Sequence, residues 1–236
     1  MANHDTWKVL PHGPIEKLGS HLWYVLGSLE SGPLKRVMVV AKRQSGGLVV
    51  HNGVCLEEER MAEIEAWGKP EVLIVPNGYH RLDAKAFKTR YPDLKVLCPR
   101  KARARAAEVV AVDGTYEDFD GDEHVKLETL DGTDHAEGVM LVTGDDGVSL
   151  VLNDVVFNMP HVPGFTGFVM KSLLSSSGGP RVSRLSRMFL VKDRKALRAH
   201  LERLADTRGL VRVIVSHHEV ISEHPKETLR EVAATV

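Results

Sequence analysis

Three apolar segments that lie far apart along the chain each carry histidine or aspartate at one end, and this pattern strongly restricts the fold. They are the run 138–142 after the turn Asp134-His135, the run 148–152 before Asp154, and the run 211–215 before His217-His218. Apolar runs of this length favour buried strands. Functional side chains often stand in the loops that follow such strands. The pattern therefore predicts a sheet with a metal site at one rim.

The order of the expected elements is that of an α/β protein. The first apolar runs are joined by short Gly-rich turns, which connect antiparallel strands. Helices and buried strands then alternate, as in a partly parallel sheet covered by helices. A second group of strands and two more helices follow. The expected strands are 21–27, 36–42, 48–51, 72–75, 95–99, 125–129, 138–142, 148–152 and 211–215, and the expected helices are 56–67, 84–90, 101–109, 197–204 and 226–234.

Length and composition exclude several classes of protein. The 236 residues suit one large core, so we expect a single domain over residues 1–236. A net charge of −1 provides no field that would attract nucleic acid, and no apolar run is long enough to span a membrane. The N-terminus lacks the pattern of a secretory signal, and Cys55 and Cys98 are expected to be buried thiols. These features favour a cytoplasmic protein that acts on a small molecule.

The order of elements and the residues at the strand ends, from about Leu18 to Glu219, resemble the metallo-β-lactamase superfamily. The matching stretches are His135-Ala136-Glu137-Gly138 for the His-Thr-x-Gly turn, Asn153-Asp154 for the strand-terminal Asp that bridges metals, and Ser216-His217-His218 for the late His. The resemblance implies a four-layer αββα sandwich of two mixed sheets, with metal bound where the loops converge.

The loop that carries most metal ligands in that family is degenerate here. After the run 72–75, where the family has His-x-His-x-Asp-His, the sequence is Pro76-Asn77-Gly78-Tyr79-His80-Arg81-Leu82-Asp83. With Asn77 at the first His position, Tyr79, Arg81 and Leu82 occupy the remaining ligand positions. The chain thus resembles a divergent branch, which a helix with Phe87 and the pair Tyr91-Pro92 also fit.

The resemblance implies a metal-dependent hydrolase in which a metal-bound water is the nucleophile. The implied ligands are His80, His135, Asp154 and His217, of which His80 and Asp154 are also the implied catalytic residues. These donors suit at most one ion of zinc, iron or manganese. Consecutive side chains of a strand point in opposite directions, so only one of His217 and His218 can face the site, and position favours His217.

A second hypothesis remains open. The same side chains could hydrogen-bond to loop backbone in a cleft without metal, and the protein would then bind a ligand or partner without catalysis. The segment 159–187 is rich in Pro and Gly and is expected to be irregular. Its apolar residues could form a lid over the cleft, the contact of a homodimer or ordinary core packing; they are Phe165, Phe168, Met170, Leu173 and Leu174. Asp83 is expected to be a helix N-cap. Asp134 is either a carboxylate that orients a histidine or a turn residue.

Overall fold

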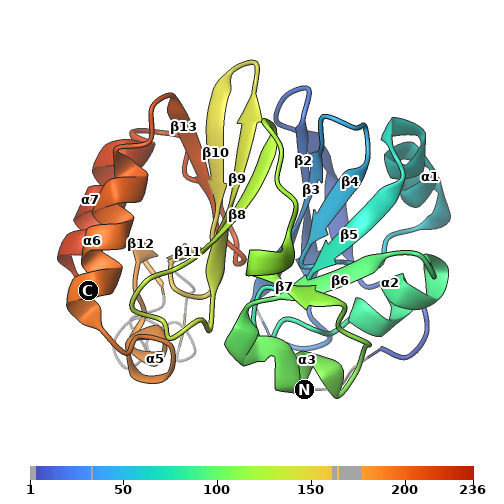
Figure 1. Ribbon diagram of the computed structural model, residues 1–236, viewed down its shortest axis with the longest axis horizontal. Coiled ribbons are helices and arrows are strands. Elements are labelled where there is room, and N and C mark those ends of the chain that lie inside the picture. The colour runs from blue at the N-terminus through green and yellow to red at the C-terminus, as the bar shows by residue number, and fades with distance from the viewer. Residues whose placement is uncertain (1–3, 33, 161–163, 165–176) are drawn as a thin grey trace.

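The computed structural model describes residues 4–32, 34–160, 164 and 177–236. Its larger sheet contains seven strands in sequence order (Figure 1). These are β1 (His12–Lys17), β2 (Leu22–Ser28), β3 (Lys35–Lys42), β4 (Leu48–His51), β5 (Pro70–Ile74), β6 (Lys95–Cys98) and β7 (Gly114–Thr115). β1 to β4 are antiparallel, whereas β4 to β7 are parallel. Parallel neighbours need crossover connections. Helices α1 (Glu58–Trp67), α2 (Ala84–Arg90) and α3 (Arg103–Ala107) lie in these connections, with η1 (Arg100–Ala102) before α3.

The smaller sheet has the order β13-β10-β9-β8 and is also mixed. Its strands are β8 (Val125–Thr129), β9 (Gly138–Gly144), β10 (Gly147–Val151) and β13 (Leu210–Ile214), and η2 (Tyr116–Asp118) precedes β8. β8, β9 and β10 form an antiparallel meander, and β13 is parallel to β10. Helices α6 (Arg194–Ala205) and α7 (Pro225–Ala234) precede and follow β13. They cover the outer face of this sheet (Figure 1).

Three buried clusters correspond to the three interfaces of a four-layer sandwich. Along β3, Met38 and Val40 belong to the cluster that includes α1 and α2, whereas Val37 and Val39 belong to the cluster between the two sheets. This alternation follows from the two-residue period of a strand. The third cluster joins the smaller sheet to α6 and α7, whose buried residues include Leu197, Leu201, Leu204, Leu229 and Val232. The prediction of a four-layer α/β sandwich of two mixed sheets is confirmed.

Several elements differ from the sequence-based expectation. β1 is a strand, although its residues include Gly13 and Pro14; it lies at the edge of the sheet, where proline is tolerated. The segment 159–187 is not uniformly irregular. The hairpin of β11 (Phe157–Met159) and β12 (Gly179–Arg181) and the helix α5 (Arg184–Phe189) occupy its described parts. The apolar residues suggested as a lid or dimer contact, Phe165, Phe168, Met170, Leu173 and Leu174, lie outside the described residues.

Two further expectations concern the whole chain. Cys55 and Cys98 are free and buried, as predicted. Among the residues that the structure describes, none of the helices is both long enough and apolar enough to cross a bilayer.

Candidate metal centre

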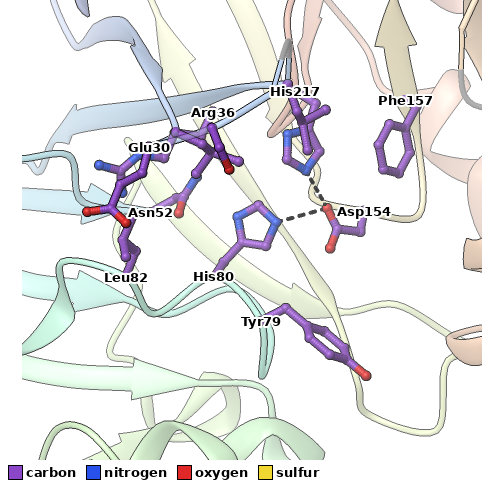
Figure 2. Close-up of a pocket in the computed structure, with 12 residues that line it drawn as sticks. Glu30, Arg36, Asn52, Tyr79, His80, Leu82, Asp154, Phe157 and His217 are labelled. Atoms are coloured by element: carbon purple, nitrogen blue, oxygen red, sulfur yellow. Dashed lines mark hydrogen bonds and ion pairs between the residues drawn. The ribbon is translucent and has the colours of Figure 1, made fainter. Parts of the chain in front are cut away.

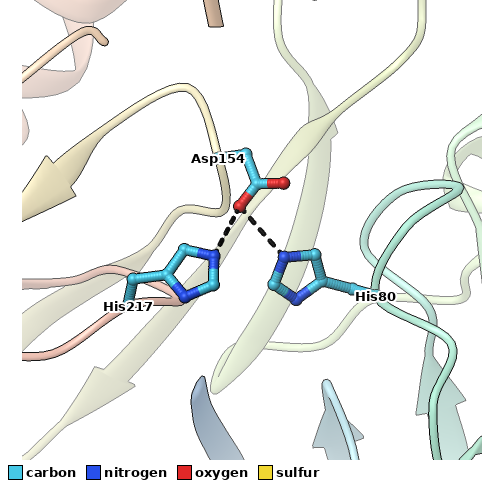
Figure 3. Close-up of side chains that lie close together, drawn as sticks. All are labelled: His80, Asp154 and His217. Atoms are coloured by element: carbon cyan, nitrogen blue, oxygen red, sulfur yellow. Dashed lines mark hydrogen bonds and ion pairs between the residues drawn. The ribbon is translucent and has the colours of Figure 1, made fainter. Parts of the chain in front are cut away.

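Three loops bring His80, Asp154 and His217 together at one end of the strands (Figure 3). Asp154 and His217 follow β10 and β13, which are parallel neighbours, so these two strands end at the same edge of the smaller sheet. His80 follows β5 of the larger sheet. The three side chains therefore lie where the rims of both sheets meet.

One carboxylate oxygen joins the two imidazoles. Asp154 Oδ1 lies 3.0 Å from His80 Nε2 and 3.0 Å from His217 Nε2. One ligand atom from each of the three residues lies within 4.8 Å of the others. Ligand bonds of about 2.0–2.1 Å place the donors of a tetrahedral zinc ion about 3.4 Å apart. The 3.0 Å distances from Asp154 Oδ1 to the two Nε2 atoms are close to this value, so the three donors suit such an ion.

The tautomer of His217 independently tests whether the site suits a metal ion. His217 Nδ1 lies 2.6 Å from the carbonyl oxygen of Lys35, which can only accept, so this nitrogen carries a hydrogen. In a neutral ring, Nε2 then presents a lone pair to Asp154 Oδ1, and two lone pairs repel each other. Either a proton or a cation must therefore lie between these atoms. Phe157 stacks on the same ring, with centroids 5.0 Å apart, and fixes its plane.

The pKa shifts of Asp154 and His217 agree with a positive charge between these two side chains. Burial disfavours the charged forms of both partners, yet the charge and hydrogen bonds of the two histidines hold the pKa of Asp154 well below its ordinary value. Likewise, burial opposes protonation of His217, but its hydrogen bond to Asp154 and the charge of that carboxylate raise the pKa of His217 above its ordinary value. The pair is built for a carboxylate facing a positive charge.

A second carboxyl group, Glu137, lies beneath Asp154 and was not predicted from the sequence. It is fully buried and accepts hydrogen bonds from the side chains of Asn77 and Asn153 and from the backbone N–H groups of Asp154 and Val155. Burial and the nearby charge of Asp154 raise the pKa of Glu137 to about 8. The available signal was an acidic residue that directly precedes the apolar strand β9.

The structure does not bring His135 to the other three expected ligands, and the donor set is corrected from four residues to three. Asp134 and His135 both have left-handed backbone conformations, with φ of 53° and 58°. The His135 side chain is 47% exposed, and its Nδ1 lies 3.4 Å from Glu117 Oε1. The turn thus directs His135 to solvent. The side chain that this stretch buries next to the three donors is that of Glu137.

Three neighbouring expectations can also be compared with the structure. Asp134 is a turn residue that pairs with Lys101, so it does not orient a histidine of the centre. Asp83 stands at the N-cap position of α2 but makes no capping hydrogen bond; its carboxylate binds other buried groups instead. His218 faces away from Asp154, and its Nε2 accepts a hydrogen bond from Lys35 N at 3.4 Å.

A pocket of about 380 Å³ opens beside the three side chains (Figure 2). His80, Asp154 and His217 line it together with Tyr79, which is 43% exposed. The rest of the lining is Leu29, Glu30, Ser31, Leu34, Arg36, Asn52, Leu82 and Phe157. Its size is within the usual range for a small-molecule site, and its walls are mainly apolar with a few polar groups.

The imidazole of His51, at the end of β4, is expected to make stability depend on pH. Its ring is buried, and within the described part of the chain neither nitrogen has a hydrogen-bond partner. Burial, and then the positive charge of His80, lower the pKa of His51 to about 3. The unfolded ring takes a proton below its ordinary pKa of 6.5 while the folded ring stays neutral, so stability is lost as the pH falls from 6.5 towards 3.

The variant His51→Leu isolates this effect. Between pH 5.5 and 4.5, the free energy of unfolding of wild type relative to the variant should fall by about 1.4 kcal/mol. Urea denaturation at several pH values measures this difference. If the free energy of unfolding changes with pH in the same way for wild type and variant, the prediction is contradicted.

Comparisons with known proteins agree with this architecture. No protein-family model and no curated protein matches the sequence. Solved structures do match: the metallo-β-lactamase DIM-1 exposed to ceftazidime superposes with a TM-score of 0.63 at 11% identity, covering 97% of this chain and 99% of that one. The metallo-β-lactamase from Erythrobacter litoralis gives 0.62 at 12% identity, covering 97% and 100%. FIM-1 from Pseudomonas aeruginosa, in its mono-zinc form, gives 0.59 at 10% identity, covering 96% of each chain. The chain therefore has the metallo-β-lactamase fold.

Proposed function

We propose that this protein is a metal-dependent hydrolase of a small molecule, with one divalent ion held by His80, Asp154 and His217. The observation that carries the proposal is the shared oxygen Asp154 Oδ1, at 3.0 Å from the Nε2 atoms of both histidines. Two imidazoles and one carboxylate suit zinc, iron or manganese. Three protein ligands also leave a coordination position open, as in catalytic zinc sites.

The roles of the three residues differ. Asp154 supplies the negative charge that the site needs and keeps the two imidazoles turned towards one another. The Lys35 carbonyl holds His217 in the tautomer that leaves Nε2 free to bind an ion. A bound ion would polarise a substrate carbonyl or phosphoryl oxygen and acidify a water molecule. Phe157 and Leu82 line the pocket and would exclude water around an apolar substrate.

The alternative of a metal-free, non-catalytic cleft is less well supported. In this alternative the polar side chains are bonded to loop backbone, as His217 Nδ1 is to the Lys35 carbonyl. The Nε2 atoms of both histidines face a carboxylate instead. The homodimer expected from the segment 159–187 stays a prediction.

Metal analysis and a hydrolysis assay test the proposal. Protein purified without chelator should hold about one equivalent of a transition metal, or take it up when zinc or manganese is added. Free zinc at roughly 100 times its Kd should raise the free energy of unfolding by about 2.7 kcal/mol. We expect chelator-sensitive hydrolysis of a chromogenic β-lactam, a thioester or a phosphodiester, and His80→Ala should lose both metal and activity. No bound metal and no thermal shift with either ion would contradict the proposal.

A further inference from the structure

The side chain of Asn77 has a fixed orientation in the site. Asn77 comes directly after Pro76, in the loop that follows β5, and is 1% exposed. Its Oδ1 accepts hydrogen bonds from the backbone N–H groups of Tyr79, at 2.8 Å, and His80, at 3.1 Å. Because backbone N–H groups can only donate, Oδ1 must be the atom on this side. The amide Nδ2 is therefore the atom that faces the buried carboxyl groups.

Both hydrogens of Nδ2 are used by those carboxyl groups. Nδ2 donates to Glu137 Oε1 at 2.7 Å and to Asp154 Oδ2 at 2.8 Å. The two oxygens of Asp154 thus have different surroundings: Oδ1 faces the two histidines, whereas Oδ2 is covered by an amide. An amide N–H is a donor and cannot bind a cation, so Asp154 Oδ2 is not free to bind a second ion while this hydrogen bond is kept.

We propose that Asn77 is a positioning residue that limits this centre to one ion, bound through Asp154 Oδ1, by covering Asp154 Oδ2. This inference rests on the proposed function, since it concerns the same ion. Glu137 and Asp154 are two carboxyl groups bridged by a single amide. Without that amide, their oxygens would form an acidic pair able to attract a further cation.

Asn77→Asp tests the inference with minimal change of shape. The aspartate keeps an oxygen that accepts from Tyr79 N and His80 N, so the loop that carries His80 retains its turn. Its other oxygen replaces Nδ2 and faces the oxygens of Glu137 and Asp154. Three carboxyl groups then converge, and a bound cation relieves the repulsion between those that are charged. Titration of the metal-free proteins with zinc at pH 8, followed by metal analysis, should give one equivalent for wild type and two for the variant.

Asn153→Asp is the matched control. Asn153 is also fully buried and its amide also donates to Glu137 Oε1, at 3.2 Å, but the Asn153 side chain makes no hydrogen bond to the carboxylate of Asp154 among the described contacts. The control adds the same charge against the same glutamate and should still bind one equivalent. Two equivalents in the control would overturn the inference, because any added carboxylate would then suffice.

The remaining outcomes separate this inference from the proposed function. If wild type and Asn77→Asp each bind one ion, the proposed role of Asn77 is overturned and the hydrolase proposal stays intact. Wild type with two ions overturns the inference directly, and wild type with none overturns both. If Asn77→Asp does not fold, a crystal structure of zinc-loaded wild type decides. Anomalous density for one ion on Oδ1, with Oδ2 still bonded to Asn77, supports the inference, whereas zinc on Oδ2 overturns it.

Discussion

Asp154→Asn is expected to abolish metal binding and hydrolysis while the protein stays folded. Asn77 Nδ2 donates to the Oδ2 position, so the new amide must place its oxygen there. Its NH2 group then occupies the Oδ1 position, 3.0 Å from both histidine Nε2 atoms, and a donor replaces the shared ligand oxygen. Loss of an outer partner of a metal ligand costs roughly 10–100-fold in affinity. Loss of the ligand itself should cost more than about 100-fold.

Calorimetric titration with zinc measures this loss, and His135→Ala provides the control. His135 is 47% exposed and lies outside the group of three donors, so its removal should leave both zinc affinity and activity unchanged. A reversal, in which His135→Ala loses zinc and Asp154→Asn retains it, would show that the ion is bound by another set of residues.

The layers of this fold could be predicted because apolar periodicity determines burial. In β3 and β4, nearly every residue is buried, which is typical of strands covered on both faces. The strand β1 could not be predicted in this way. Five of its six residues, HGPIEK, are polar or break regular structure, and its pairing with β2 depends on a neighbour that the local pattern does not reveal.

The candidate site was predictable in part, for a different physical reason. Position after an apolar strand indicated His80, Asp154 and His217, because strand ends meet at the rim. The direction of a side chain within a turn does not follow from position. His135 and Glu137 lie two residues apart, yet the left-handed backbone at His135 leaves it exposed while Glu137 is buried. The sequence places Asn77 at the position of a lost ligand, but its contacts with Glu137 and Asp154 depend on segments distant in sequence.

Arg36, which lines the pocket, belongs to a buried ion pair that also involves the N-terminal segment. Asp83 Oδ2 accepts from Arg36 Nη2 at 2.5 Å and from Cys55 N at 3.1 Å, and Asp83 Oδ1 lies 2.6 Å from His4 Nδ1. The side chains of Asp83 and Arg36 are 0% and 4% exposed. Asp83 is three residues from His80, and Arg36 lines the pocket. The pair therefore connects the N-terminus, the larger sheet and the loop of the metal centre.

Asp83→Ala should destabilise the protein by about 3–5 kcal/mol, the usual cost of leaving one member of a buried pair without its partner. Arg36, whose side chain is 4% exposed, would then keep its charge without this partner. Replacing Arg36 by Met in the same chain removes that charge and should recover part of the loss. Urea denaturation of both single variants and the double variant measures the coupling.

The exposed pair Lys69–Asp93 is the matched control, since its side chains are 70% and 87% exposed and lie 3.5 Å apart. Asp93→Ala should change the free energy of unfolding by less than about 0.5 kcal/mol, because solvent already screens this pair. If Asp83→Ala and Asp93→Ala lower the free energy of unfolding by the same amount, burial of the Asp83 pair has no energetic consequence. A double variant less stable than both single variants would show that Arg36 stabilises the fold through contacts other than Asp83, and the pocket wall would then not depend on this ion pair.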